Sequence, residues 1–134
     1  MNEPEWITRE ECLAMHEKLL AWFGGLEGIR DDGLLDSALN KPRQQLTYGN
    51  PTVFDLAAAN AFGIVKNHPF LDGNKRAGFV AAALFLETNG FRFQAPEEEA
   101  VLETLALAAG ESTESAYAAW LEKNSGRAGV GPTD

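Results

Sequence analysis

HPFLDGNKRAG, residues 68–78, interrupts a chain that is otherwise rich in alanine and leucine. A histidine, an aspartate, an asparagine and two cations stand close together here. Apolar residues dominate residues 56–65 before the stretch and residues 77–86 after it, which predicts a buried helix on each side. The polar stretch is therefore expected to be a short loop held between two core helices, and the fold is best worked out from this loop.

Outward from this loop, capping residues and apolar spacing predict six helices. The fourth, nearly all apolar from residue 77 to 86, is expected to be the central helix. The first four are expected to run from Thr8 to Phe23, from Asp31 to a limit at Pro42, from Thr52 to Asn67 and from Gly73 to about Thr88. The fifth is expected to begin at Pro96 and the sixth at Ser112 or Thr113.

Two short segments have the composition of β-structure. The alternation in FRFQ, residues 91–94, predicts a strand. The second segment, Gln45, Leu46, Thr47 and Tyr48, lies between Pro42 and a run of turn residues, so we interpret it as a loop or flap. The predicted fold class is all-α in the main: a compact bundle of about six helices with one or two short β segments.

The length of 134 residues suits a single domain. We place this domain at residues 1–124. Residues 125–134, SGRAGVGPTD, are small and polar and are expected to form a disordered tail.

Composition excludes several classes of protein. A net charge of −9 argues against direct binding of nucleic acid, which relies on clustered lysine and arginine. One cysteine cannot form an internal disulfide, and two histidines with one cysteine do not make a structural zinc site. The alanine-rich runs are too short to span a bilayer, so no membrane association is expected. These features favour a cytoplasmic protein.

The start of the fourth predicted helix has the composition of a phosphate site. Backbone N–H groups in the first turn of a helix lack partners, and the helix dipole favours an anion there. We expect Gly73, Asn74 and Lys75 to offer their amides, Asn74 to add its side-chain amide, and Lys75 and Arg76 to add positive charge. Gly73 also allows the backbone to approach a ligand closely.

Three other residues of the stretch have separate expected roles. Asp72 beside a phosphate suggests Mg²⁺ as a bridge, although an aspartate before a helix is also a common N-cap. His68 would be a general base, the neutral-pH proton acceptor near the loop, unless it is an ordinary loop histidine. Phe70 is expected to point into the core and anchor the loop.

The stretch resembles the signature of the Fic/Doc superfamily, His-x-Phe-x-Asp/Glu-Gly/Ala-Asn-x-Arg. Its fixed positions are filled by His68, Phe70, Asp72, Gly73, Asn74 and Arg76. GIRDDGLLDSALNKPRQ, DLAAANAFGIVKNHPF and AALFLETNGF are similar to the corresponding parts of Doc-type (death-on-curing) toxins of toxin–antitoxin systems, in the same order. The resemblance therefore covers most of residues 28–93.

The resemblance implies a Doc-like protein kinase that uses ATP and Mg²⁺. Fic AMP transferases typically carry a glycine and a second arginine where this chain has Lys75 and Phe79, so the Doc branch fits better. In that branch His68 is the general base, Asp72 the metal ligand, and Asn74, Lys75 and Arg76 hold the phosphate. AMP transfer at the same site remains the alternative enzymatic reading.

The resemblance also implies partners. The family's target is a threonine of elongation factor Tu, whose modification stops translation, and the flap at residues 45–48 would hold the target segment, although an ordinary loop is an equally good reading. No inhibitory helix of the Fic type is found in the sequence, so restraint is expected from a separate antitoxin chain. The candidate residues of its groove are Trp22, Phe23, Tyr117 and Trp120, each of which is also a candidate core residue. A third hypothesis is a non-catalytic module that binds only the antitoxin.

Overall fold

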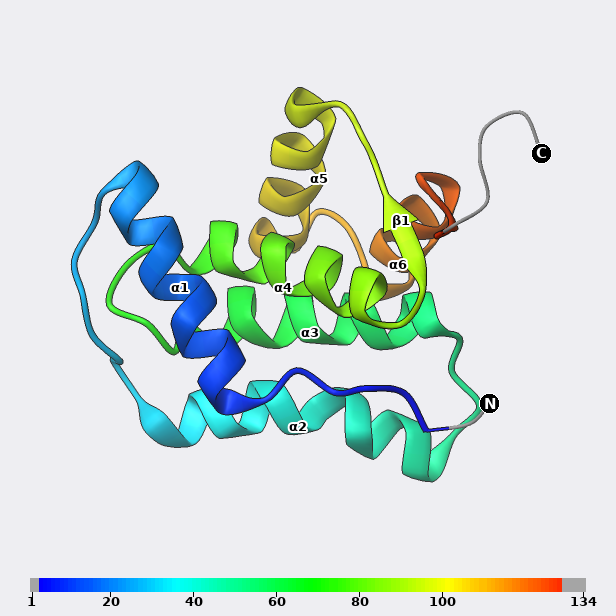
Figure 1. Ribbon diagram of the computed structural model, residues 1–134, viewed down its shortest axis with the longest axis horizontal. Helices are drawn as coiled ribbons and strands as arrows, with labels where there is room; N and C mark the ends of the chain where they lie inside the picture. The colour runs from blue at the N-terminus through cyan, green and yellow to red at the C-terminus, as the bar shows by residue number, and fades with distance from the viewer. Residues whose placement is uncertain (1–2, 129–134) are drawn as a thin grey trace.

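The computed structural model describes residues 3–128, which form six α-helices and a small sheet (Figure 1). This confirms the mainly helical fold class. The elements are α1 (Arg9–Phe23), α2 (Asp32–Tyr48), α3 (Val53–Asn67), α4 (Asn74–Thr88), β1 (Phe91–Phe93), α5 (Glu97–Ala109), α6 (Glu114–Lys123) and β2 (Ser125–Arg127).

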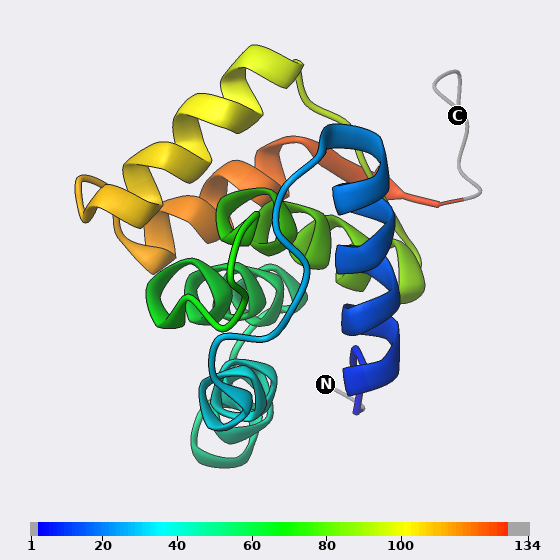
Figure 2. The same cartoon turned by 90° about the vertical axis from the view of Figure 1, so that its left-hand side faces the viewer.

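Helices α3 and α4 lie side by side at the centre of the bundle. Helix α3 packs against α2 on one side and α6 on the other, while α4 is flanked by α1, α5 and β1 (Figures 1 and 2). The sequence placed α4 alone at the centre, whereas α3 is the helix with the most extensive burial, from Leu56 to Val65. A run of alanines leaves it apolar on nearly every side, so it can be covered by neighbours all round.

Two glycines let neighbouring helices approach closely, one between α3 and α2 and one between α4 and α3. A Cβ on Gly63 would stand 2.9 Å from Cα of Ala38 in α2, and a Cβ on Gly78 would stand 2.7 Å from the side chain of Val65 in α3. Neither distance is compatible with normal packing, so both helix contacts depend on the missing side chain. The close packing of α3 and α4 fixes the two ends between which the polar loop is held.

Side-chain caps set the starts of α1, α2, α3 and α6 as predicted. Thr8 and Thr52 each form a capping box, with Glu11 and Asp55 respectively. Asp31 and Thr113 accept hydrogen bonds from backbone amides of the first turns of α2 and α6.

The prediction of a β-like flap at residues 45–48 is wrong. Helix α2 continues through Pro42, and Gln45, Leu46, Thr47 and Tyr48 form its last turn. The reason is tertiary, because Glu114 of α6 accepts a hydrogen bond from Gln45 at 2.8 Å and forms an ion pair with Lys41 at 3.0 Å. These contacts hold the helix on both sides of the proline, whose missing N–H would otherwise favour an end.

The prediction of a disordered tail from residue 125 is also wrong for its first residues. Ser125–Arg127 form β2, which pairs antiparallel with β1 so that Phe91 lies opposite Arg127. The amide of Ala128 extends the pairing by donating to the carbonyl of Gly90. Residues 129–134 of the expected tail lie outside the described residues.

Among residues 3–128, no helix is long and apolar enough to cross a membrane.

Candidate active site

The loop of residues 68–73 joins α3 to α4 and is pinned by Phe70. The Phe70 side chain is only 1% exposed, and its ring stacks on the ring of His16 from α1, with centroids 3.7 Å apart and planes within 8°. His16 is itself buried, and its Nε2 lies 2.8 Å from the carbonyl oxygen of Asp72. Because a carbonyl only accepts, Nε2 carries the proton in this contact. The anchoring role of Phe70 is thus supported by its packing.

His16 was missed as a member of the site by the sequence reasoning, which treated His68 as the proton acceptor near the loop. A signal was present, since Leu13, His16 and Leu20 follow helical spacing along one face of α1. The structure puts His16 beneath the loop, with its Nε2 engaged by the backbone of Asp72. We therefore assign it to loop support, and His68 remains the exposed histidine of the pair.

Asn74 braces the loop with its side chain. Its Oδ1 accepts from the amide of Phe70 and its Nδ2 donates to the carbonyl of Phe70, each at 3.0 Å. Nδ2 also lies 3.4 Å from Nδ1 of His68. The expectation that this amide would bind phosphate is therefore not what the structure shows, because both of its polar atoms are engaged inside the loop. Only the backbone N–H of Asn74 keeps the expected position, in the first turn of α4.

His68 stands at the edge of this braced loop with its side chain exposed. It is the C-cap of α3, and its own N–H donates to Ile64 at 3.1 Å. Its backbone is left-handed, with φ 50 and ψ 56, the one non-glycine residue with positive φ in the described part of the chain. Residues with a side chain adopt this conformation uncommonly, and such positions concentrate at functional sites.

The N-terminus of α4 differs from the other helix starts. Its N-cap is Gly73, at φ 76°, and like α5 it has no side-chain cap. Each of the other five described helices has an acid in its first turn, whereas α4 has none and carries Lys75 and Arg76. The N-terminal end of a helix carries partial positive charge, so cations there are repelled unless a bound anion compensates them. The arrangement suits a bound phosphate group.

Asp72 is not the N-cap of α4. Its Oδ1 accepts from the amide of Gly73 at 2.9 Å, and its Oδ2 accepts from the amide of Leu26 at 3.2 Å. Each carboxylate oxygen has a second lone pair, so the exposed group can still bind a cation. The described residues contain no cluster of three His, Cys, Asp or Glu that could hold a metal. One carboxylate with phosphate and water ligands is, however, the way that Mg²⁺ is commonly held.

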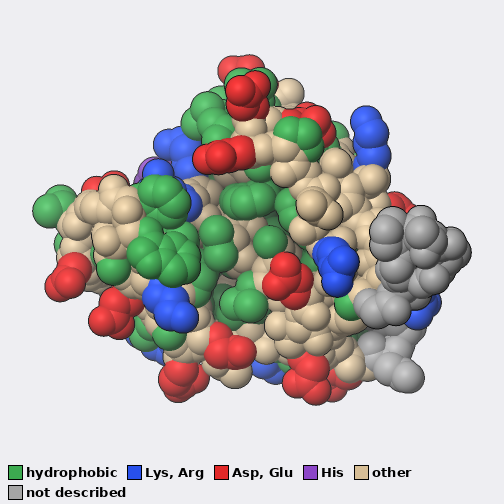
Figure 3. Space-filling model, turned by 45° about the horizontal axis from the view of Figure 1, so that its top comes forward, with side chains coloured by type: hydrophobic (Ala, Val, Ile, Leu, Met, Phe, Trp, Pro, Cys, Tyr) green, Lys and Arg blue, Asp and Glu red, His purple; other side chains and the backbone are tan. Residues whose placement is uncertain are grey.

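Two cavities share Lys75 and Leu105 as lining residues. One of about 490 Å³ is lined by His68, Lys75 and the C-terminal half of α5. The other, of about 450 Å³, is a mainly apolar groove between the end of α1, α4 and α5, and Lys75 and Arg76 stand on its wall. Figure 3 looks onto this face and shows hydrophobic side chains gathered in a hollow between α1 and α5. The groove and the expected phosphate site thus share a wall.

The four aromatic candidates for such a groove divide into two kinds. Tyr117 and Trp120 are buried in the core, so the core reading holds for them. Trp22 and Phe23 are 71% and 59% exposed at the end of α1. Phe23 lines the groove, and the guanidinium of Arg76 lies 4.1 Å from its ring centroid. Phe23 therefore holds one of the expected phosphate ligands by a cation–π contact.

The expected flap does not join the site. Residues 45–48 end α2 beside the start of α3, whereas His68 follows the end of α3, and Figure 1 shows the two at opposite ends of the bundle. Helix α3 has 15 residues and so spans about 22 Å. A polar cavity of about 790 Å³ does border Gln45 and Tyr48. Its use in target binding stays a prediction.

Comparison with known proteins places these features in one family. Residues 6–86 match the model described as "Fic/DOC family". The chain is 32% identical over 124 residues to "Protein kinase doc" of Escherichia phage P1, covering 91% of this chain and 97% of that protein. It is 39% identical over 94 residues to "Toxin Doc" of Mycolicibacterium smegmatis, covering 68% of this chain and 69% of that protein.

Proposed function

The chain belongs to the Fic/Doc family, and on that premise we propose that it is a Doc-like toxin that transfers the γ-phosphate of ATP to a hydroxyl group of a protein target. The observation that carries the proposal is the start of α4, where Lys75 and Arg76 replace the usual acids and His68 and Asp72 flank the same turn. The residues that would bind phosphate, act as the base and hold the metal then lie together in one short loop and the helix turn that follows it.

The backbone N–H groups of the first turn and the two cations bind the phosphates of ATP. Charge-assisted hydrogen bonds of this kind strengthen as negative charge develops on the transferred group. Asp72 would hold Mg²⁺, and the ion would supply further neutralisation of that charge. Phe23 and the braced loop keep the protein groups in place before the substrate arrives.

His68 accepts the proton of the attacking hydroxyl group. The oxygen then bonds to the γ-phosphorus, the bond to the β-phosphate oxygen breaks, and ADP leaves. The 3.4 Å contact of Nδ1 with Asn74 is long for a hydrogen bond, so little is lost when the ring turns its lone pair to a substrate. His68 and Lys75 line one cavity, so a substrate held there contacts both residues.

Phosphate transfer is favoured over AMP transfer by two positions. Lys75 occupies the place of the glycine that gives room for a diphosphate in Fic AMP transferases. Phe79 occupies the place of their second arginine, and its ring packs against Phe93 and Trp120 at centroid distances of 5.8 and 6.3 Å. A residue built into this aromatic cluster is part of the packing, and it supplies no second cation to the phosphates.

The apolar groove beside the phosphate site suits a separate antitoxin. It is lined by Leu19, Phe23, Phe79, Val80 and α5, and Val101, Leu102 and Leu105 of α5 are 52%, 67% and 45% exposed. Apolar surface of this kind is commonly covered by a partner. A segment bound there would touch Lys75 and Arg76 directly, which is a simple means of inhibition.

The target is proposed to be a threonine of elongation factor Tu, with arrest of translation in the cytoplasm as the outcome. The test is to incubate the purified chain with Mg²⁺, γ-labelled ATP and a bacterial lysate, and to identify the labelled protein by mass spectrometry. His68→Ala should abolish transfer and growth inhibition, while Arg92→Met, an exposed substitution on β1, should leave both intact. Transfer that survives in His68→Ala would refute the proposal.

A further inference from the structure

The segment between α1 and α2 lies across the loop that carries His68. The amides of Arg30 and Asp31 donate to the carbonyl of Pro69 at 2.6 and 3.1 Å, and the amide of Leu71 donates to the carbonyl of Gly28 at 3.1 Å. Ile29 and Phe70 form an antiparallel bridge between these bonds. Figure 2 looks onto the end of the bundle where the two segments cross.

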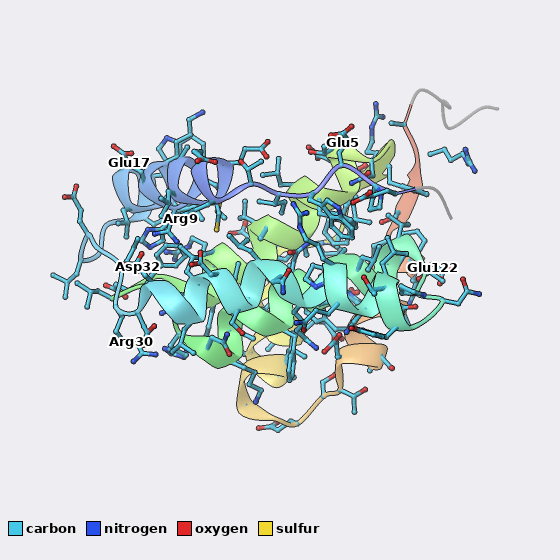
Figure 4. The ribbon with its side chains drawn as sticks, turned by 90° about the horizontal axis from the view of Figure 1, so that it is seen from below. Glu5, Arg9, Glu17, Arg30, Asp32 and Glu122 are labelled. Atoms are coloured by element: carbon cyan, nitrogen blue, oxygen red, sulfur yellow. The ribbon has the colours of Figure 1, made fainter. Side chains whose placement is uncertain are left out.

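The side chain of Arg30 adds a second set of contacts, on the end of α3. Its Nε donates to the carbonyl of His68 at 2.6 Å, and its Nη2 donates to the carbonyl of Asn67 at 2.7 Å. Figure 4 labels Arg30 at the end of the molecule where α2 begins. A guanidinium matches two neighbouring carbonyls with a fixed fork, and its charge suits the negative end of a helix dipole.

These contacts fall on the residue whose backbone is most unusual. His68 is left-handed, although such a conformation is unfavourable for a residue with a Cβ. Among the described residues its ring has one polar contact, a weak one at 3.4 Å, so hydrogen bonding contributes little to holding the ring. The direction of the imidazole therefore depends on its backbone, and the backbone carbonyls on both sides of its Cα are bound by Arg30.

We propose that Arg30 is a positioning residue for His68: by binding the carbonyls of Asn67 and His68, it holds His68 in the left-handed conformation that directs the imidazole to the phosphate site. The inference rests on the proposed function for its kinetic consequence. Arg30 acts through His68 and needs no contact with ATP. Its loss should lower the rate of the chemical step and leave ATP binding nearly unchanged.

The test compares wild type with Arg30→Met, Arg30→Lys and the matched control Arg92→Met. Methionine keeps the length of the arginine stem but offers no donor, whereas lysine keeps the charge with a single compact donor group. We expect Arg30→Met to lower kcat for phosphate transfer about tenfold with KM for ATP changed less than twofold, because small misplacements of a reacting group are costly. Arg30→Lys should fall between Arg30→Met and wild type, and Arg92→Met should match wild type.

A second readout does not require activity. The Cα and Cβ chemical shifts of His68, measured by NMR, report its backbone conformation and should move away from left-handed values in Arg30→Met. Wild-type kcat together with unchanged His68 shifts would overturn the inference, and a raised KM with unchanged kcat would show that Arg30 binds ATP instead. If Arg30→Met does not fold, Arg30→Lys gives both readouts. If the wild type transfers no phosphate, the proposed function fails, and unchanged His68 shifts would then overturn the positioning role separately.

Discussion

Replacing Asn74 by alanine should destabilise the protein more than a typical loop substitution. Both hydrogen bonds between its amide and the backbone of Phe70, each at 3.0 Å, would be lost. The hydrogen bonds of the bridge between Ile29 and Phe70 are made by Pro69 and Leu71, the residues on either side of Phe70. The N–H and C=O of Phe70 itself therefore point away from this bridge and toward Asn74. No other partner in the described chain then replaces the asparagine amide for these two groups.

The magnitude follows from the number of groups left without partners. Each net hydrogen bond is worth about 1 kcal/mol, and a buried polar group without a partner costs about 1–3 kcal/mol. Water can reach part of a loop at the molecular surface, so the lower part of the summed range applies. The free energy of unfolding should fall by about 2–4 kcal/mol in Asn74→Ala.

The assay is urea unfolding followed by circular dichroism, with the free energy taken by linear extrapolation. Asn60 of α3 is a matched control, because it is also buried, at 2% exposure, but its Nδ2 has no partner among the described residues. Asn60→Ala should cost clearly less than Asn74→Ala, since no hydrogen bond of Nδ2 is lost. Equal losses in the two variants, or a loss below about 1 kcal/mol in Asn74→Ala, would refute the bracing role.

Three further predictions concern the core. Gly63→Ala should lower the free energy of unfolding by about 1–3 kcal/mol, because the new Cβ would stand 2.9 Å from Ala38. This loss outweighs the better helix propensity of alanine. The control Gly126→Ala, whose new Cβ would have nothing within 4 Å, should be nearly neutral in the same urea assay. Burial raises the pKa of Tyr117 to about 12, so as pH rises the unfolded state loses this proton before the folded state does. The free energy of unfolding should therefore fall as pH rises from about 10 to 12. Urea unfolding across this range should show a smaller fall in Tyr117→Phe. Burial raises the pKa of Cys12 to about 11, so a thiol reagent at about pH 8 should react only as fast as the protein unfolds, and reaction in the folded state would contradict the packing of α1.

The helix starts were predictable because their chemistry is local. Thr8, Thr52 and Thr113 each accept a hydrogen bond from the amide three residues later, and that spacing can be read directly from a sequence. The loop of residues 68–73 was predictable for a related reason. Its polar residues interrupt two apolar runs that both had to be buried, and Phe70 was the largest apolar residue in the loop.

The errors arose where distant residues override a local preference. Pro42 is a local signal for a helix end, but Glu114 lies 69 residues from the Gln45 that it holds. Ser125–Arg127 have no strand-like pattern and become a strand only because β1 offers an edge for pairing. In the site, His16 is 56 residues from Asp72 and Arg30 is 38 residues from His68. Helical spacing can place His16 on one face of α1, but the local sequence identifies the partner in neither contact.

Asn74 shows that a motif can be identified correctly while the role of one of its residues is not. The sequence indicated that an asparagine at the start of α4 would offer its amide to phosphate, and the motif gives no sign of the backbone of Phe70 as a competing partner. In the structure the asparagine side chain holds the loop, so the proposed function assigns the anion to the backbone and the cations of α4. A chemical role read from residue types therefore needs the hydrogen-bond partners before it is assigned.

The measurement that tests the central claim most directly is transfer of label from ATP to protein, with α-labelled and γ-labelled ATP in parallel reactions containing Mg²⁺ and a bacterial lysate. The account predicts label from γ-labelled ATP alone, on one main protein, and its loss in His68→Ala. Label from α-labelled ATP would show AMP transfer at the same site, and absence of label from both would indicate a module that binds its partner without catalysis; either result would contradict the account.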